Sequence, residues 1–385
     1  MTCPSTEVSM MGPHSQPERI DLATADDPRD VVHRAVACLA QGGIVGLATE
    51  TVYGLVAGAL HAAAVVRLRQ GRGFEMPTPL TLLLRGPVEV ADWVADLSQL
   101  GWRLARRAWP GPITLLFPAP ASRGLADHLP AEVRPLLFPD ETVALRVPSH
   151  RFIREILGLL PGPLVLSEAQ GPDGGVVTTA DPLVEMEGVE MVVDAGPTQL
   201  GGVSTAVRVE SDRWTIVRPG VVEPSVLTRM AGMILLFVCT GNTCRSPMAE
   251  ALCKMLLAQR IGCAVDELEG RGYVVLSAGM AAAHGMPAAA YAIDVVRARG
   301  GSLEHHASRQ LTAELVRHAD QIIAMTKDHL ESLLDQVPEC APRTRLLHPL
   351  GEDVPDPIGS TRETYLRTAR EIERYLELLL DEMGL

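Results

Sequence analysis

From Met233 onward, strand-like apolar runs alternate with helical segments, and this alternation constrains the fold more than any other feature of the sequence. The strand candidates lie at 234–238, 274–276 and 321–325, and the helix candidates at 248–259, 288–299 and 363–382. Alternation of this kind builds a parallel sheet covered by helices on both faces. We therefore predict an α/β domain with a doubly wound parallel sheet over residues 233–385.

The preceding residues show a different pattern, in which short strand candidates are joined by long connections rich in proline and glycine. These candidates lie at 44–48, 80–84, 113–117, 143–147, 164–166, 191–193, 204–209 and 214–217. Helices are sparse among them, so we expect a mixed, curved sheet with few helices. We predict a disordered tail over 1–18, this first domain over 19–228, and the second domain over 233–385.

The composition excludes several classes of protein. The formal net charge is -13 and only 4% of the residues are aromatic, so we expect no direct nucleic-acid partner. Seven cysteines are thinly spread along the chain, which argues against a disulfide framework and for a reducing cytoplasm. We see no signal peptide and no apolar run of the roughly 20 residues that a membrane span needs. A cytoplasmic protein without a membrane partner is the expectation.

The most specific local signal is the string VCTGNTCRSP, which starts at Val238. It places Cys239 at the end of a buried strand and Arg245 six residues later, where a helix begins. Backbone amides of residues 240–245 can then point at a tetrahedral anion, with the positive end of the helix behind them. The same field favours the Cys239 thiolate, Arg245 can grip two phosphoryl oxygens, and Gly241 allows a tight turn.

A proton donor for a leaving group is available at Asp356, whose neighbour Pro357 restricts its backbone to extended conformations. This residue lies in the loop before the final predicted helix. In a doubly wound sheet, that loop reaches the carboxyl edge of the strands, where the cysteine loop also lies. We expect Asp356 to lie near Cys239.

This region resembles the low-molecular-weight protein tyrosine phosphatase family over 233–385, through VCTGNTCRSPMAE, Ser277-Ala278-Gly279, Ser308-Arg309-Gln310-Leu311, Ala324-Met325-Thr326 and Asp356-Pro357. The resemblance implies a four-stranded parallel sheet and a phosphatase without a cofactor that acts on phosphorylated proteins. It makes Cys239 the nucleophile, Arg245 the oxyanion binder, and Asp356 the general acid and then base. Residues implied to support the phosphate loop or its selectivity are Thr240, Gly241, Asn242, Thr243, Cys244, Ser246 and Ser277.

Two features of this region bear on the substrate. Tyrosine-specific members usually follow Asp-Pro with aromatic residues, whereas this chain has Ile358-Gly359. Thr243 together with Asp-Pro-Ile-Gly resembles the bacterial protein arginine phosphatase branch of the family. A narrower pocket suits a phosphoguanidinium better than a flat ring, so we place phosphoarginine ahead of phosphotyrosine and keep both.

Residues 20–222 resemble the YrdC-like threonylcarbamoyl-adenylate synthases, through GIVGLATETVYGL from Gly43, Trp109-Pro110-Gly111-Pro112, Arg146-Val147-Pro148-Ser149-His150, Gly202-Val203-Ser204-Thr205 and Arg218-Pro219-Gly220. The resemblance implies a nucleotidyltransferase that uses threonine, bicarbonate and ATP with Mg²⁺, in a tRNA-modification pathway with its own partner proteins. The residues implied to bind nucleotide or threonine are Thr49, Thr51, Tyr53, Arg72, Thr142, Arg146, Ser204 and Arg218.

Two motifs of that family are altered here. Gln70-Gly71-Arg72 replaces Lys-x-Arg, and Glu168-Ala169-Gln170 replaces Ser-x-Asn. The first change removes a cation, and a carboxylate at 168 would repel a phosphate by about 1 kcal/mol or more at short range. Two hypotheses remain for this domain: a synthase of reduced efficiency in a bifunctional enzyme, or a non-catalytic sensor of nucleotide or threonine that regulates the phosphatase.

Overall fold

The computed structural model describes residues 16–70, 80–120, 124–171 and 174–385. The chain divides into two compact units, Met1–Val226 and Leu227–Leu385. Most of the predicted tail lies outside the described residues, and the first strand begins at Glu18, within the range predicted for that tail. Among the described residues, no helix is long and apolar enough to cross a membrane.

The first unit contains one ten-stranded sheet in the order β1-β8-β2-β3-β7-β4-β6-β5-β9-β10. It contains both parallel and antiparallel pairs, which confirms the predicted mixed sheet. Its strands are β1 (Glu18–Asp21), β2 (Val45–Ala48), β3 (Tyr53–Gly58), β4 (Thr81–Leu83), β5 (Ile113–Pro118), β6 (Thr142–Arg146), β7 (Leu164–Glu168), β8 (Met191–Asp194), β9 (Thr205–Glu210) and β10 (Arg213–Arg218).

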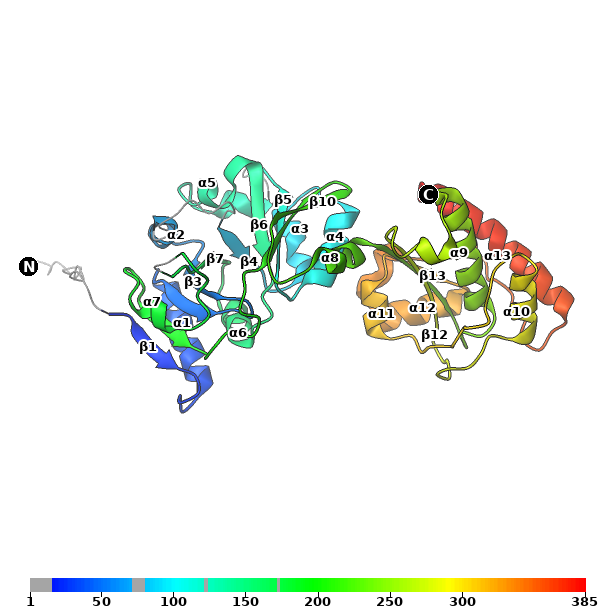
Figure 1. The fold of residues 1–385 in the computed structure, drawn as a ribbon, viewed down its shortest axis with the longest axis horizontal. Helices are drawn as coiled ribbons and strands as arrows, with labels where there is room; N and C mark the ends of the chain where they lie inside the picture. The colour runs from blue at the N-terminus through cyan, green and yellow to red at the C-terminus, as the bar shows by residue number, and fades with distance from the viewer. Residues whose placement is uncertain (1–15, 71–79, 121–123, 172–173) are drawn as a thin grey trace, which may run out of the picture. The chain divides into compact units, whose positions relative to one another are not determined.

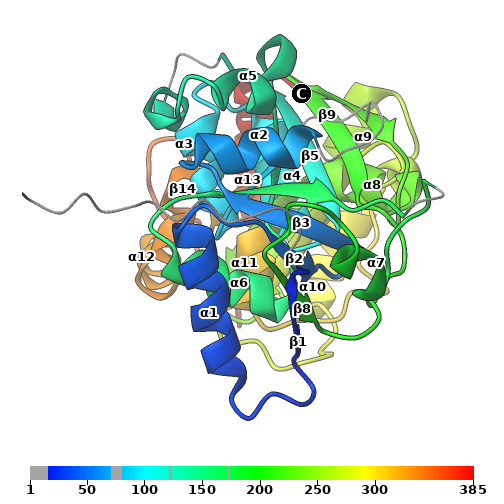
Figure 2. The same cartoon turned by 90° about the vertical axis from the view of Figure 1, so that its left-hand side faces the viewer.

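The helices of this part of the chain are α1 (Pro28–Ala40), α2 (Ala62–Gln70), α3 (Val90–Trp93), α4 (Gln99–Ala108), α5 (Arg134–Leu137), α6 (Arg151–Leu159), α7 (Asp181–Val184) and α8 (Pro224–Ala231). Helix α1 starts where Asp27 accepts a hydrogen bond from the Arg29 amide, and it stops before Gly42, whose φ of 80° suits glycine. Helices α1 and α6 pack side by side, and their apolar faces share one core cluster with β2 and β7 (Figure 2).

The sheet of the first unit is strongly curved. Glu168 ends β7 and Arg218 ends β10, and four other strands lie between these two in the sheet order. Five steps of strand spacing amount to about 24 Å in a flat sheet. The two side chains nevertheless form a hydrogen bond of 2.9 Å from Arg218 Nη2 to Glu168 Oε1. The ends of distant strands therefore converge on one concave region, which positions the first site described below.

The second unit contains a four-stranded, fully parallel sheet in the order β12-β11-β13-β14, as predicted for a doubly wound domain. Its strands are β11 (Met233–Cys239), β12 (Tyr273–Gly279), β13 (Gln321–Ala324) and β14 (Thr344–Leu346). Its helices are α9 (Arg245–Ile261), α10 (Ala290–Arg297), α11 (Ala313–His318), α12 (Lys327–Gln336) and α13 (Arg362–Glu382).

Successive residues of β11 face the two sides of this sheet. Leu235 and Phe237 pack into the core with α9, α10 and α13, whereas Leu236 and Val238 pack into the core with α11 and α12. Figure 1 shows these helices on opposite sides of the sheet. Because both faces are covered, the strand is an unbroken apolar run. Its one chemically reactive side chain, Cys239, comes at its carboxyl end.

Candidate functional sites

The phosphate loop of the second unit joins β11 to α9. Cys239 is the last residue of the strand and Arg245 is the first residue of the helix. The tight turn between them depends on Asn242, which has a φ of 53°, a left-handed conformation that asparagine tolerates better than most residues. Gly241 was expected to provide this turn, but its φ is not positive, and a Cβ there would meet only Thr243 Oγ1 at 3.7 Å.

Two groups approach the sulfur of Cys239. The amide of Asn242 donates to Sγ over 3.2 Å, and Ser246 Oγ lies 2.9 Å from the same atom. Cys239 itself is only 3% exposed. Donors directed at a sulfur in this way stabilise the charge of a thiolate, which is the nucleophilic form of cysteine.

A buried side-chain network holds Asn242 in its unusual conformation. Its Nδ2 donates to Ser246 Oγ over 3.0 Å and to Ser277 Oγ over 2.8 Å, while its Oδ1 accepts from the Arg309 amide. Ser277 in turn donates to Glu250 over 2.6 Å. These bonds explain how a strained loop residue stays in place before any anion arrives.

The structure brings Asp356 to the phosphate loop. Arg245 Nη2 lies 2.5 Å from Asp356 Oδ2, and Arg245 Nη1 donates to the carbonyl of Val354. The arginine is 6% exposed at its side chain, whereas the aspartate is 40% exposed. One partly exposed carboxylate therefore lies directly beside the arginine of the phosphate loop.

Cys244 and Thr243 occupy the far part of the loop. The thiol of Cys244 lies 3.2 Å from the hydroxyl of Tyr365, and burial together with this contact raises the pKa of that tyrosine. Both Cys239 and Cys244 are free thiols. Thr243 is half-buried, and its carbonyl accepts from the Ala289 amide, so a β-branched side chain stands in a fixed part of the loop.

In the first unit, Thr49 and Thr51 form a tight turn. Their hydroxyls lie 2.8 Å apart, and Thr49 Oγ1 also donates to the carbonyl of Val52. The turn joins β2 to β3, which are antiparallel neighbours in the sheet. An antiparallel pair can be closed by a few residues, which brings both hydroxyls to one strand end.

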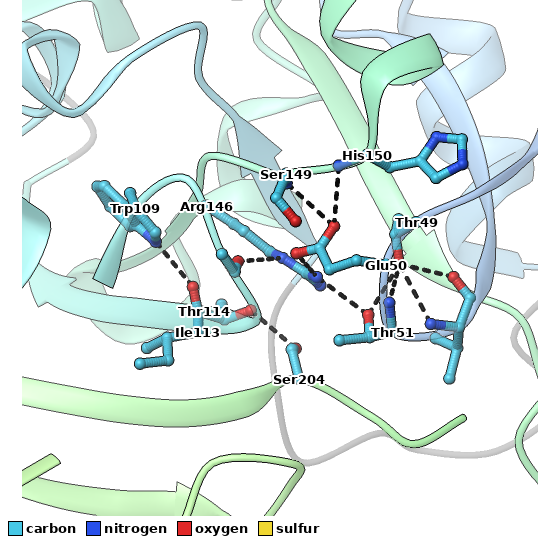
Figure 3. A network of polar contacts seen from close by, with 12 residues as sticks. Thr49, Glu50, Thr51, Trp109, Ile113, Thr114, Arg146, Ser149, His150 and Ser204 are labelled. Carbon is cyan, nitrogen blue, oxygen red and sulfur yellow. Dashed lines mark hydrogen bonds and ion pairs between the residues drawn. The ribbon is translucent and has the colours of Figure 1, made fainter. Parts of the chain in front are cut away.

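Arg146 and Glu50 form a fully buried ion pair beside this turn (Figure 3). Arg146 Nη2 lies 2.7 Å from Glu50 Oε1 and donates to Thr51 Oγ1 over 3.0 Å, while Nη1 has no hydrogen-bond partner among the described residues. Burial alone would raise the pKa of Glu50, but attraction to Arg146 holds it below its ordinary value.

Ser204 and Arg218 are brought together, but Glu168 already occupies them. Ser204 Oγ donates to Glu168 Oε1 over 2.8 Å, and Arg218 reaches both carboxylate oxygens through its two terminal nitrogens. Burial acts to raise the pKa of Glu168, yet attraction to Arg218 keeps it below its ordinary value, so the group is a carboxylate. The two groups expected to hold a nucleotide phosphate hold an internal anion instead.

The other residues expected in this site are more dispersed. Tyr53 directs its hydroxyl to the carbonyl of Gly196 over 2.8 Å, and burial raises its pKa to about 12. Thr142 starts β6, at the opposite end from Arg146, and its hydroxyl donates to the Asp140 carbonyl. The structure therefore does not bring Thr142 to the Arg146 site. Gln70 is exposed at the end of α2, and Arg72 lies outside the described residues.

Comparison with known proteins assigns both units. Residues 234–384 match the family model described as low molecular weight phosphotyrosine protein phosphatase. In that region, the protein-arginine-phosphatase of Bacillus subtilis (strain 168) is 36% identical over 155 residues, which cover 39% of this chain and 97% of that protein. The chain belongs to the low-molecular-weight phosphatase family. The low molecular weight protein-tyrosine-phosphatase Etp of Escherichia coli (strain K12) is 37% identical over 145 residues, or 36% of this chain and 87% of that protein.

The first unit adds a second domain to this phosphatase. Residues 37–220 match the Sua5_yciO_yrdC model, which is described as telomere recombination. The threonylcarbamoyl-AMP synthase of Pyrococcus abyssi (strain GE5 / Orsay) is 28% identical over 202 residues, which cover 52% of this chain and 57% of that protein. The chain therefore joins a low-molecular-weight phosphatase domain to a region that is similar to the Sua5/YrdC family, and it spans little more than half of this synthase.

Several residues of the phosphatase site were not foreseen from the sequence. Gly279 ends β12, and a Cβ there would come within 2.6 Å of the Thr240 carbonyl and 2.9 Å of the Asn242 amide, so the loop can lie close only to glycine. His306 Nε2 lies 2.8 Å from the carbonyl of Asn242. His329 contacts Thr240. In the first unit, Glu50 was missed, although its position between Thr49 and Thr51 was a usable signal.

Proposed function

We propose that the second unit is a cysteine-dependent protein phosphatase whose nucleophile is Cys239. The observation that carries this proposal is the convergence of the Asn242 amide and Ser246 Oγ on Sγ, with the Arg245–Asp356 pair at the open side of the same loop. Sγ attacks phosphorus, the bond to the leaving group breaks, and Asp356 gives the departing atom a proton. Asp356 then takes a proton from water, which attacks phosphorus, frees Cys239 and yields inorganic phosphate.

Arg245 has two successive partners in this scheme. It pairs with Asp356 in the structure, and it would turn its planar fork toward the equatorial phosphoryl oxygens when substrate binds. The chemistry needs only the thiol, the guanidinium, the carboxyl and the loop amides of the chain itself. A phosphorylated protein is the substrate class, as in the family.

We propose phosphoarginine as the preferred substrate. Ile358 follows the Asp-Pro pair and is 65% exposed, so no aromatic wall stands at that point of the loop. Thr243 narrows the pocket. A specific observation supports phosphotyrosine as the second candidate: Tyr291 is 43% exposed and packs edge-on against Tyr365, which contacts Cys244.

A side-by-side assay separates these substrates. We expect the full-length protein to have a higher kcat/KM for a phosphoarginine peptide than for the matched phosphotyrosine peptide. Thr243→Gly should improve phosphotyrosine hydrolysis, because it removes the β-branched side chain from the loop, and Thr243→Ser serves as the control for loss of the methyl group alone. A wild-type preference for phosphotyrosine in kcat/KM would overturn the assignment.

Oxidation should inactivate the phosphatase reversibly, because a thiolate is the form that peroxide attacks. Cys244, in the same loop, can condense with the sulfenic acid of Cys239 to form a disulfide and release water. After mild peroxide treatment, we expect dithiothreitol to restore wild-type activity more fully than that of Cys244→Ser. Cys263→Ser is the matched control, since that cysteine lies outside the loop. Equal recovery in the three proteins would remove the protective role of Cys244.

For the first unit, we propose a threonine-binding domain with weak ATP affinity and slow or absent adenylate formation. Arg146 keeps a free Nη1 for a carboxylate, whereas Glu168 engages Ser204 and Arg218. An incoming phosphate must displace this carboxylate and lose charge-assisted hydrogen bonds of roughly 1.5 to 3 kcal/mol each. Slow formation of threonylcarbamoyl-adenylate would still supply a tRNA-modification pathway. If adenylate formation is absent, the first unit would act as a sensor of threonine or nucleotide.

The test is pyrophosphate release with ATP, threonine and bicarbonate. We expect little release from the wild-type protein and more from Gln70→Lys/Glu168→Ser/Gln170→Asn, provided that calorimetry shows threonine binding in both. Glu168→Gln is an informative intermediate, since it removes the charge but keeps the shape. Robust release by the unmodified protein at ordinary ATP concentrations would restore the plain bifunctional enzyme.

A further inference from the structure

A buried histidine joins the phosphate loop to the start of a neighbouring helix. His329 lies in the first turn of α12 and is 7% exposed. Its Nε2 lies 2.9 Å from Thr240 Oγ1, and its Nδ1 lies 2.8 Å from Thr326 Oγ1. Thr240 directly follows the nucleophile, and Thr326 caps the helix. Both ring nitrogens are therefore engaged, one of them by a residue of the phosphate loop.

We call the chain of contacts from Thr326 through His329 to Thr240 the bridge. Its hydrogen bonds show which atom donates at each step. Thr326 Oγ1 accepts the backbone amide of His329 in its role as helix cap, so its own proton can go to Nδ1. A neutral imidazole that accepts at Nδ1 carries its proton at Nε2 and donates it to Thr240. The Thr240 oxygen then acts as an acceptor toward the ring, which fixes the rotamer of a loop side chain that is otherwise exposed.

The charged surroundings favour the neutral ring. Burial lowers the pKa of His329 first, and the Arg245 guanidinium lowers it further, whereas the carboxylates of Asp328, Asp353 and Asp356 oppose both effects. A proton on Nδ1 would also remove the acceptor that Thr326 uses. Both the surroundings of His329 and its contact with Thr326 therefore favour the uncharged ring.

We propose that His329 is a positioning residue of the phosphatase, which holds Thr240 and thereby the first peptide of the phosphate loop in the orientation that receives a phosphoryl group. This inference rests on the proposed phosphatase function of the second unit. A second contact supports it: the Thr240 carbonyl accepts from the Ala281 amide, so the bridge and this bond fix both sides of one residue. His329 itself touches no substrate and exchanges no proton with it.

The experiment uses the full-length protein and inorganic phosphate as the ligand, so that binding is measured without turnover. Calorimetry gives the Kd for phosphate in the wild type, His329→Leu, Thr240→Val and the double variant. Loss of one hydrogen bond should raise Kd by about three- to tenfold in each single variant. The double variant should be no weaker than the worse single variant, because both changes break the same bond. Thermal unfolding of each protein separates this effect from a general loss of stability.

His329→Gln provides the rescue, because its amide nitrogen can donate to Thr240 from a similar distance. We expect it to bind phosphate more tightly than His329→Leu and to keep more of the wild-type pH profile for iodoacetamide alkylation of Cys239. Unchanged phosphate binding in His329→Leu, or additive losses in the double variant, would refute the bridge. A wild type that binds phosphate but does not hydrolyse para-nitrophenyl phosphate refutes the phosphatase alone, and the Kd comparison still decides the role of His329.

Discussion

Replacing Cys239 with serine is expected to abolish hydrolysis of every phosphorylated substrate while leaving the fold and phosphate binding intact. A serine hydroxyl is protonated at neutral pH, and the two groups that contact this position among the described residues, the Asn242 amide and the Ser246 hydroxyl, are not bases. The anion site survives, because it is made of backbone amides, Arg245 and the Asn242 network. Steady-state assays with para-nitrophenyl phosphate, together with calorimetry of inorganic phosphate, check both halves of the expectation.

The matched control is Cys253→Ser. Cys253 is fully buried on α9, outside the loop, and burial raises the pKa of its thiol to about 12. The folded Cys253→Ser variant should hydrolyse para-nitrophenyl phosphate at the wild-type rate, even if the substitution lowers its thermal stability. Substantial turnover by Cys239→Ser would show that the mechanism proposed here is wrong.

Asp356→Ala should trap a phosphoenzyme. Removal of a general acid and base typically costs 10²- to 10⁴-fold in rate. A substrate with a good leaving group bypasses the missing acid, so Cys239 becomes phosphorylated, but the water step still lacks its base. We expect a burst of para-nitrophenol followed by slow turnover, and a mass increase on the peptide that contains Cys239. The variant should also bind phosphate at least as well as the wild type, since Arg245 loses its internal partner.

Glu352→Ala controls for the loss of a carboxylate in the same loop. Its side chain is 72% exposed and lies 3.6 Å from His348 Nε2. This variant should keep both turnover and phosphate binding. A wild-type rate in Asp356→Ala would exclude Asp356 as the acid and base and direct attention to another group.

The phosphate loop could be anticipated from the sequence because its geometry is local. A strand, a short loop and a helix in direct succession place Cys239 and Arg245 with little freedom, and the topology of a parallel sheet then places Asp356. What the sequence could not show was the turn residue. The residue type favoured Gly241 as the turn residue, but Asn242 adopts the left-handed conformation. Its side chain forms hydrogen bonds with partners from distant segments, which the sequence does not show.

The first unit was harder to predict because its site is built by curvature. The sequence indicated Glu168 as a repulsive group and Arg218 as a phosphate ligand, and nothing in it indicated that they meet. Their pairing requires the ends of β7 and β10 to converge across the sheet. Thr142 was expected in the same site as Arg146, but the two residues lie at opposite ends of one strand, four positions apart.

If the first unit binds anions as proposed, the Glu168–Arg218 pair acts as a competitor that is built into the chain. Because the carboxylate is covalently tethered, its local concentration is fixed and cannot be diluted. A closed pair that is populated about 100 times more than the open one lowers the apparent affinity for any external anion about 100-fold, whatever the quality of the remaining contacts. Under the proposed function, ATP would therefore need a concentration about 100 times higher to reach the same occupancy, and occupancy would keep changing with ATP concentration where an unobstructed site is already full.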